Sequence, residues 1–401
     1  MGVAHVLSLT CRCRKIYLVF RMAERCVYRT GPWANYGRMV DVNGVTEHAD
    51  LAEGTPAGTR REFAPDAPPD GARFDPSDTR EAHAYGERGK VPRRPQGILR
   101  LGHVDTTVTD LDLASAYYTG VMGMEITART EDSVYLKCWD EEDHHSLRLR
   151  YAPRQGMDLM SFKVHHDDDL VDLENKVTRY GFPVERISKG ETLGQGESIR
   201  FATPSGHLME LVADVEKVGA SGRRRTPDPA TGDQPFPRDK ICPPRMDHML
   251  IHAEEVGEST QFFMDVLGFR ITEQLLDGNG HQLGSWLERS NSPHDLAIVH
   301  GPNGGLHHFA FWLDDWDDVR DAADVLAYNG IQLDVGPTRH GITRGSTIYF
   351  FDPLGTRNEV FTGGYRPDPD FPTLTWTEDN IGRAIFYYEG QVNERFMRVH
   401  T

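Results

Sequence analysis

The chain has 401 residues and a formal net charge of −17 at pH 7, from 44 basic and 61 acidic side chains. This length allows two or three domains, each with a sizeable core. Hydrophobic residues make up 38% of the chain, which with 39 glycines is an ordinary globular composition. The negative charge opposes nonspecific binding to nucleic acid or to anionic membranes. A small molecule is therefore the expected ligand.

The cysteines and the first residues predict a cytoplasmic protein. The five cysteines are scattered and odd in number, so no disulfide framework is implied. No apolar run reaches the roughly 18 residues of a membrane helix. The opening MGVAHVLSLTCRCRKIYLVFR has its apolar residues before its basic cluster, the reverse of a secretory signal. Met22 offers a second start, and we hypothesise that residues 1–21 are an over-long gene prediction.

Residues 1–96 are predicted to form a flexible N-terminal extension. Stretches such as EFAPDAPPDGARFDPSDTREAHAYGERGK are rich in Gly, Pro and charged residues and have almost no hydrophobic periodicity. Such a composition buries too little apolar surface to offset the entropy lost on ordering.

The remainder is predicted to contain two similar domains, 97–215 and 245–362, joined by a linker over 216–244 and followed by a tail over 363–401. At a shift of 145 to 149 positions, ILRLGHVDTTV matches RMDHMLIHA and FATPSGHLMELV matches FFDPLGTRNEVF. In both copies a Pro, with a Gly two residues later, predicts the turn of a hairpin whose second strand carries Glu210 or Glu359. The chain therefore contains an internal duplication.

Each domain is predicted to contain two smaller units of one strand, one helix and further strands. In the second domain, the strand around MDHMLI precedes a helical pattern at Ser259 to Leu267, and GLHHFAFWL precedes another at Trp316 to Tyr328. The predicted fold class is α+β, built of tandem βαβββ modules. Strand alternation places His307 and His308 on opposite faces, so only one of them points into a given cavity.

Three residues in strand-like segments of the second domain, His248, His308 and Glu359, make up the ligand set of a mononuclear non-haem Fe(II) site. Two imidazoles and one carboxylate leave about three coordination positions open, enough for a bidentate substrate and dioxygen. A curled sheet brings such distant residues together. Taken singly, each is more often a buried polar group with hydrogen-bond partners. The combination favours oxygenase chemistry.

The first domain keeps only part of this set. His103 and Glu210 match two of the ligands, but the position equivalent to His308 is Leu159 in GMDLMSFKV. An aliphatic side chain in place of an imidazole would lose most of the affinity for Fe(II). We therefore expect metal binding in the second domain alone, with His103 and Glu210 as structural remnants.

From about Gly97 onward the chain resembles the catechol 2,3-dioxygenase (metapyrocatechase) family of type I extradiol dioxygenases, in the vicinal oxygen chelate superfamily. The resembling stretches include GHVDTTVTDLDLASAYY, LHHFAFWL, GPTRHGITRGSTIYFFDPLGTRNEVF and TWTEDNIGRAIFYY. GPTRHGITRG and the hairpin of Glu359 are specific to these dioxygenases. The N-terminal extension has no counterpart in the resemblance, and the segment between His300 and His308 is one residue shorter than expected.

The resemblance implies a role for each site residue. The family's metal ligands fall on the three residues named above. His294, in SPHDLAIVH, matches the acid/base histidine beside the oxygen site, a role suited to a side chain that titrates near neutral pH. His340 in TRHGIT and Tyr349 in TIYFF match groups that hydrogen-bond the substrate oxygens. Candidate walls of an apolar substrate pocket are Trp286, Ile342, Thr343 and Phe386.

The expected activity is extradiol cleavage of catechol, or of a simple substituted catechol, by O2 to 2-hydroxymuconate semialdehyde, in the degradation of aromatic compounds. Two alternatives remain open at this point. One is a non-redox member of the same fold, a glyoxalase-like isomerase or a thiol transferase, and the other is a metal-free module that binds aromatic compounds. The expected cofactor is Fe(II), with Mn(II) possible because both ions accept this donor set. The resemblance also implies a homo-oligomer, a tetramer.

Overall fold

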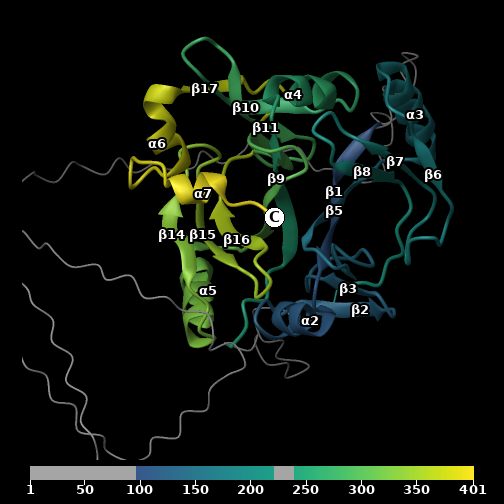
Figure 1. The fold of residues 1–401 in the computed structure, drawn as a ribbon, viewed down its shortest axis with the longest axis horizontal. Helices are drawn as coiled ribbons and strands as arrows, with labels where there is room; N and C mark the ends of the chain where they lie inside the picture. Colours follow the sequence, from purple (N-terminus) through teal and green to yellow (C-terminus); the bar gives the residue numbers. More distant parts are fainter. Residues whose placement is uncertain (1–95, 221–238) are drawn as a thin grey trace, which may run out of the picture.

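The structure, a computed structural model, describes residues 96–220 and 239–401. The predictions for residues 1–95 and for most of the linker lie outside the described residues. The described chain forms two mixed sheets, one from the N-terminal part in blue and teal and one from the C-terminal part in green and yellow, which lie side by side (Figure 1). Among the described helices, we find none with the length and apolar character needed to cross a membrane.

The N-terminal sheet has eight strands in the order β2-β3-β4-β1-β5-β8-β7-β6. Its strands are β1 (Ile98–Val108), β2 (Glu125–Arg129), β3 (Ser133–Lys137), β4 (Leu147–Tyr151), β5 (Gly156–Val164), β6 (Glu185–Ile187), β7 (Ser198–Ala202) and β8 (Leu208–Val212). Two helices, α2 (Leu111–Gly120) and α3 (Asp167–Tyr180), follow β1 and β5. Asp110 caps α2 through the backbone N–H of Leu113, at 2.9 Å.

The C-terminal sheet has nine strands in the order β14-β15-β16-β13-β9-β12-β11-β10-β17. Its strands are β9 (Arg245–Ala253), β10 (Arg270–Leu276), β11 (Gln282–Glu288), β12 (Leu296–His300), β13 (Leu306–Trp312), β14 (Leu333–Arg339), β15 (Gly345–Phe351), β16 (Arg357–Gly363) and β17 (Leu374–Thr377). The helices α4 (Val256–Asp265) and α5 (Trp316–Tyr328) follow β9 and β13. Both match the predicted helical patterns, although α4 begins three residues earlier.

Strand pairing confirms the four βαβββ modules. In each module the first strand pairs in parallel with the last one, as β1 does with β4, β5 with β8, β9 with β12 and β13 with β16. The two modules of a sheet then join through their antiparallel first strands, β1 with β5 and β9 with β13. The predicted α+β fold class is therefore correct, and each sheet has two first strands side by side at its centre.

The predicted hairpins also form in both halves. The β7–β8 turn contains Gly206 at φ 77°, and the β15–β16 turn contains Gly355 at φ 99°, both in the left-handed region that favours glycine. In each turn the glycine N–H donates to a carbonyl three residues earlier, on Thr203 or Asp352. These turns set the register that carries Glu210 and Glu359 toward the centres of the sheets.

The two halves share one hydrophobic core. Phe262 of α4 packs its ring 5.2 Å from Tyr180, at the end of α3, and Phe162 of β5 packs 5.4 Å from Phe269. Tyr118 of α2 donates a hydrogen bond of 3.2 Å to a buried Asp352 carboxylate oxygen. Aromatic contacts at and just after α4, together with a hydrogen bond from α2, thus hold the two sheets against each other.

The C-terminal tail packs onto the C-terminal sheet. After β17 come a short 3-10 helix, Glu378–Asn380, and two short helices, α6 (Ile381–Ile385) and α7 (Glu394–Arg398), drawn in yellow beside β14–β16 (Figure 1). The tail ends in a reciprocal backbone pair between Thr401 and Leu306, with N···O distances of 2.8 and 2.9 Å. It therefore reaches the first residue of β13.

Candidate metal centre

His248, His308 and Glu359 lie on β9, β13 and β16, three strands that are neighbours in the sheet. Ala310 of β13 pairs with His248 on one side and with Glu359 on the other. His308 lies two residues before Ala310, and residues two apart on a strand share a face. The sheet therefore brings residues far apart in the sequence to one point.

The donor atoms of these three residues converge in a buried position. One Glu359 oxygen, Oε2, lies 3.3 Å from His248 Nε2 and 3.0 Å from His308 Nε2. One donor atom from each residue lies within 4.8 Å of the others, and all three side chains are at most 3% exposed. This is the combination that the sequence predicts as a ligand set.

The surroundings leave the inward-facing atoms available for a metal. Asp247 Oδ2 lies 3.1 Å from His248 Nδ1, and His307 Nδ1 lies 2.7 Å from His308 Nδ1. These contacts orient each ring so that its Nε2 points at the carboxylate. His308 Nε2 is buried and lies 3.0 Å from Glu359 Oε2. The rings of His307 and His308 meet at their Nδ1 atoms, so the predicted placement on opposite faces is not observed; a register shift between Leu306 and His308 interrupts the strand alternation. The donor set fits a divalent transition metal.

The protonation of the cluster follows from its mutual contacts. Burial raises the pKa of Glu359, but hydrogen bonds to His248 and His308 outweigh burial and hold the pKa well below its usual value. Burial lowers the pKa of His308 to about 4 despite the opposing effect of Glu359. Glu359 is therefore anionic and His308 neutral at neutral pH, as the predicted ligand set requires.

His294 lies beside the cluster, just before β12. Its ring centroid is 4.0 Å from that of His248, and its Nδ1 is buried without a hydrogen-bond partner. Burial lowers the pKa of His294 well below its usual value, and the nearby His248 lowers it further. The structure thus places an unpaired imidazole nitrogen next to the three converging donors.

His340 and Tyr349 form a hydrogen-bonded pair on the other side of Glu359. His340 Nε2 lies 2.8 Å from the Tyr349 hydroxyl, and His340 Nδ1 contacts the Ile385 carbonyl oxygen. A carbonyl only accepts hydrogen bonds, so Nδ1 carries the proton in the neutral tautomer and Nε2 accepts from tyrosine. Burial raises the pKa of Tyr349 well above its usual value, so the phenol keeps its proton.

A cavity of about 50 Å³ adjoins these side chains. Three of the four predicted wall residues line it, namely Trp286, Ile342 and Thr343. Phe386, the fourth, lies behind His340, its ring stacked at 6.2 Å. The cavity lining is mostly apolar, which suits an aromatic ring.

Sequence reasoning missed several lining residues, although some carried a signal. Leu250 and Phe361 each lie two positions after a predicted ligand, and strand alternation alone places them on the same face. Ile385 and Phe396 come from the tail and carried no such signal, because their approach depends on how the tail folds back. The tail thus supplies part of the cavity wall.

The loop at Ile342 and Thr343 is held in place by a buried carboxylate. Thr343 has a φ of 60°, in the left-handed region that is costly for a β-branched residue. Glu273 Oε1 accepts a hydrogen bond of 2.6 Å from the Thr343 N–H, and Tyr365 and Trp376 donate to the same carboxylate. Glu273 therefore fixes a strained loop at the cavity wall.

Comparison with known proteins identifies the family. Residues 157–216 match the catechol 2,3-dioxygenase-like N-terminal domain, and residues 245–360 match the glyoxalase/bleomycin resistance protein/dioxygenase superfamily. Metapyrocatechase from Pseudomonas sp. (strain CF600) is 41% identical over 310 residues, which cover 76% of this chain and 99% of that protein. The chain belongs to the extradiol ring-cleaving dioxygenases.

Solved structures of extradiol dioxygenases show the same fold. The 2,3-dioxygenase LapB from Pseudomonas sp. KL28 is 40% identical with a TM-score of 0.66, and the match covers 72% of this chain and 100% of LapB. Homoprotocatechuate 2,3-dioxygenase from Brevibacterium fuscum, in complex with 3,4-dihydroxyphenylacetate, is 26% identical with a TM-score of 0.69, over 78% of this chain and 95% of that one. The recognition of the family from sequence is therefore confirmed.

Family membership also implies a catalytic metal. A manganese-dependent 2,3-dihydroxybiphenyl 1,2-dioxygenase from Geobacillus genomosp. 3 is 31% identical over 297 residues, 73% of this chain and 94% of that protein. This extradiol dioxygenase is thus a metal-dependent, ring-cleaving enzyme, and the buried cluster of His248, His308 and Glu359 offers a fitting donor set.

Proposed function

We propose that this extradiol dioxygenase binds Fe(II) through His248, His308 and Glu359 and opens catechol, or a simple substituted catechol, next to the diol. The product would be 2-hydroxymuconate semialdehyde. The observation that carries the proposal is the convergence of two imidazoles and one carboxylate at a cavity that His294, His340 and Tyr349 also line. In this proposal residues 245–362 are the catalytic domain and residues 97–215 are a supporting domain.

Fe(II) in such a site supplies acidification of a chelated ortho-diol and a route for electrons between the ring and dioxygen. The protein holds the three ligands rigidly. Thr347 Oγ1 donates 2.6 Å to Glu359 Oε1, while Oε2 faces both imidazoles. One carboxylate against a divalent ion leaves a positive charge, which favours a catecholate as the ligand.

His294 is proposed to move a proton at its unpaired Nδ1. The ring packs against His248, and its buried Nδ1 has no partner within the protein. A neutral imidazole in this position can accept a proton from a substrate hydroxyl and return it later in the reaction. Among the described residues, no carboxylate hydrogen-bonds the ring, so the ring can change its protonation state without breaking an ion pair.

The His340–Tyr349 pair is proposed to hold a substrate oxygen. Tyr349 is anchored on β15 opposite Glu359, and its ring lies 5.2 Å from that of His308. The tautomer fixed by the Ile385 carbonyl directs the tyrosine proton toward His340 Nε2. A substrate oxygen that approaches this pair can accept from the phenol or from the protonated imidazole. The pair therefore positions the ring and passes a proton.

The cavity wall shields the site from bulk water and limits the size of a bound aromatic ring. Trp286, Ile342 and the tail residue Phe396 are all at most 5% exposed. A low-dielectric wall strengthens the electrostatic effect of the nearby charges. The cavity of about 50 Å³ has room for a few water molecules, so a bound ring requires side chains to shift. Catechols without bulky substituents fit this constraint best.

The direct test is an assay of the anaerobically purified protein reconstituted with Fe(II). Catechol should give a yellow ring-fission product with one dioxygen consumed per catechol. Reconstitution with Mn(II) in parallel tests the choice of metal. A glyoxalase-like isomerase or a thiol transferase would consume no oxygen, so a lack of oxygen uptake across a panel of catechols would contradict the proposal.

We also propose that the enzyme is a cytoplasmic homotetramer, as the family resemblance implies. The scattered cysteines support a reducing compartment. Light scattering coupled to size-exclusion chromatography would measure the mass of the assembly. A monomer of about 45 kDa would contradict the tetramer.

A further inference from the structure

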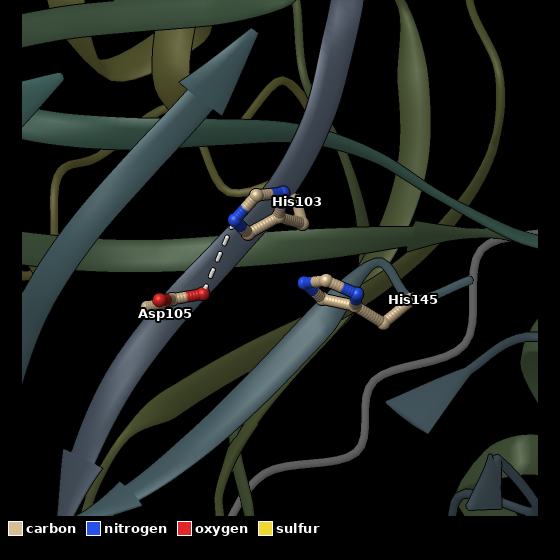
Figure 2. A group of neighbouring side chains, drawn as sticks. All are labelled: His103, Asp105 and His145. Atoms are coloured by element: carbon tan, nitrogen blue, oxygen red, sulfur yellow. Dashed lines mark ion pairs between the residues drawn. The ribbon is translucent and has the colours of Figure 1, made fainter. Parts of the chain in front are cut away.

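The N-terminal sheet contains a second cluster of potential metal ligands. His103 and Asp105 lie two positions apart on β1, and His145 lies just before β4. Figure 2 shows the three side chains pointing toward one another, with the ion-pair contact of 3.4 Å between His103 Nε2 and Asp105 Oδ1. One donor atom from each residue lies within 4.8 Å of the others, and all three side chains are at most 2% exposed.

Two residues of this cluster, Asp105 and His145, do not lie at the positions equivalent to His308 and Glu359, and the strand register shows why. Asp105 pairs with Leu159 across β1 and β5, and at the same place Leu250 pairs with His308 across β9 and β13. In the C-terminal half, the potential ligand of this pair is His308 on β13 and the leucine is Leu250 on β9. In the N-terminal half, the leucine is Leu159 on β5 and the potential ligand is Asp105 on β1.

The second imidazole also comes from a different strand. His145 precedes β4 as His294 precedes β12, and these strands are the parallel partners of β1 and β9. The ring centroids of His145 and His103 are 4.5 Å apart, and those of His294 and His248 are 4.0 Å apart. His145 therefore occupies the place that the catalytic half gives to its proposed acid/base histidine.

Two of the converging atoms have no hydrogen-bond partner. They are Asp105 Oδ1 and His145 Nε2, both fully buried. The second polar atom of each side chain does have a partner. Arg148 donates to Asp105 Oδ2 at 3.3 Å, and His144 Nδ1 lies 2.9 Å from His145 Nδ1. This imidazole pair repeats the one that holds His308. Burying unpaired polar atoms is costly unless a ligand satisfies them.

Glu210, the counterpart of Glu359, is already satisfied in the N-terminal half. Its Oε2 accepts from Arg200 at 2.8 Å and from Ser198 at 3.1 Å, and its Oε1 accepts from Ser161 at 3.0 Å. The carboxylate left for an ion is that of Asp105, whose contact with Arg148 is longer. Glu210 Oε1 lies 3.8 Å from His103 Nε2 and forms part of the surroundings.

We propose that His103, Asp105 and His145 form a second site for a first-row divalent cation such as Zn(II) or Mn(II), separate from the catalytic centre. Two imidazoles and one carboxylate are a suitable donor set for these ions. His144 engages Nδ1 of His145, which leaves the buried Nε2 as the ring nitrogen available to an ion. The bound ion joins β1 to the segment that leads into β4. Its role is to stabilise the N-terminal domain.

A cavity between the two domains lies next to His145. His145 is one of the residues that line a cavity of about 460 Å³, together with residues from both sheets. This lining contains six acidic and three basic side chains, so its net charge attracts cations. A divalent ion can therefore approach His145 without passing through the catalytic cavity.

The test counts metal ions per chain after dialysis of the full-length protein against Zn(II) or Mn(II). We expect two ions for the wild type, one for Glu359→Gln, one for Asp105→Asn and none for the double variant. Asp158→Asn is the matched control, since Asp158 is an arginine-bound carboxylate of the same sheet, at 2.6 Å from Arg150. This control should retain two ions.

Two further measurements do not depend on activity. Crystals of the wild type, measured at the absorption edge of the metal, should show anomalous peaks in both domains. Added Zn(II) should raise the melting temperature of Glu359→Gln, which keeps only the second site, and should raise that of the double variant less. One ion per chain in the wild type, or no peak between His103 and His145, would overturn the proposal and leave a His103–Asp105 ion pair without a metal.

Discussion

Glu210 and Glu359 occupy the same place in the two halves of the molecule, yet their neighbours differ. Each lies on the second strand of a hairpin, where Arg200 pairs with Glu210 and Tyr349 pairs with Glu359. Arg200 binds its glutamate directly, at 2.8 Å, whereas Tyr349 binds His340 instead. An arginine supplies a fixed positive charge, so Glu210 needs no metal. Glu359 faces two imidazoles instead. Burial lowers the pKa of His248, but hydrogen bonds with Asp247 and Glu359 outweigh burial and raise it to about 9.

Under the proposed function, one duplicated fold yields an active half and a supporting half. The sheet centre places the same positions together in both halves, and a few substitutions decide their chemistry. With Arg200 bound to Glu210 and Leu159 in place of an imidazole, the N-terminal half lacks the proposed ligand set of the C-terminal half. Asp105, on the strand next to that of Leu159, belongs to the second site that we propose. Four substitutions, each made in a separate variant, test this difference between the two halves.

The largest effect is expected for Glu359→Ala. Removing the anionic ligand should abolish stable Fe(II) binding and lower ring cleavage to the detection limit, because two imidazoles alone bind Fe(II) weakly. The matched variant Glu210→Gln should keep the catalytic iron and most of the activity. Iron analysis and oxygen uptake measure both. Retention of iron by Glu359→Ala would contradict the ligand set.

The next largest effect is expected for His294→Gln, which removes the proposed proton carrier but keeps the volume. Iron content should stay at the wild-type level, while kcat falls by roughly 10²–10⁴-fold, the usual range for loss of general acid–base catalysis. His281→Gln, at an exposed turn, serves as the control. Stopped-flow and steady-state assays should separate the chemical step from binding. A loss of iron would indicate that His294 is a metal ligand and not the proton carrier.

A moderate effect on stability is expected for Arg200→Met. The change leaves the fully buried Glu210 without its cation, and the unfolding free energy should fall by about 2 kcal/mol, a typical value for a lost hydrogen bond to a charged group. Urea denaturation measures this. Combining Arg200→Met with Glu210→Leu should restore much of the lost stability. Failure of this rescue would show that the arginine stabilises the sheet by other contacts.

The smallest effect is expected for Tyr349→Phe, which removes one hydroxyl and keeps the ring. Loss of its hydrogen bond to His340 should lower kcat by about tenfold, equivalent to about 1.4 kcal/mol. KM for catechol and iron content should change little. An unchanged kcat would indicate that the Tyr349 hydroxyl has no role in the reaction and that the ring only packs in the core.

Much of the fold followed from local patterns. The alternation around MDHMLI and LHHFAFW, the two helices and the Pro-Gly turns all predicted elements that the structure contains. The convergence of His248, His308 and Glu359 followed from the repeat and the family resemblance, not from spacing. Register between first strands is a long-range property, so local periodicity could not fix it.

What the sequence reasoning missed depended on contacts across strands or on the tail. Asp105 went unnoticed because only the positions equivalent to known ligands were compared, although HVD already places His103 and Asp105 on one face of a strand. His145 lies at the shift of the repeat from His294, so a wider comparison would have found it. Phe396 could not be foreseen, since its approach follows from the packing of a short helix after an irregular segment.

The end of the tail has a practical consequence for handling the enzyme. Thr401 exchanges two backbone hydrogen bonds with Leu306, two residues before His308, and the Phe396 carbonyl lies 2.8 Å from His307, the partner of His308. An affinity tag fused after Thr401 would disturb these two hydrogen bonds and thereby the strand that carries this proposed ligand. We expect C-terminally tagged protein to release iron faster during purification than the same protein without a tag.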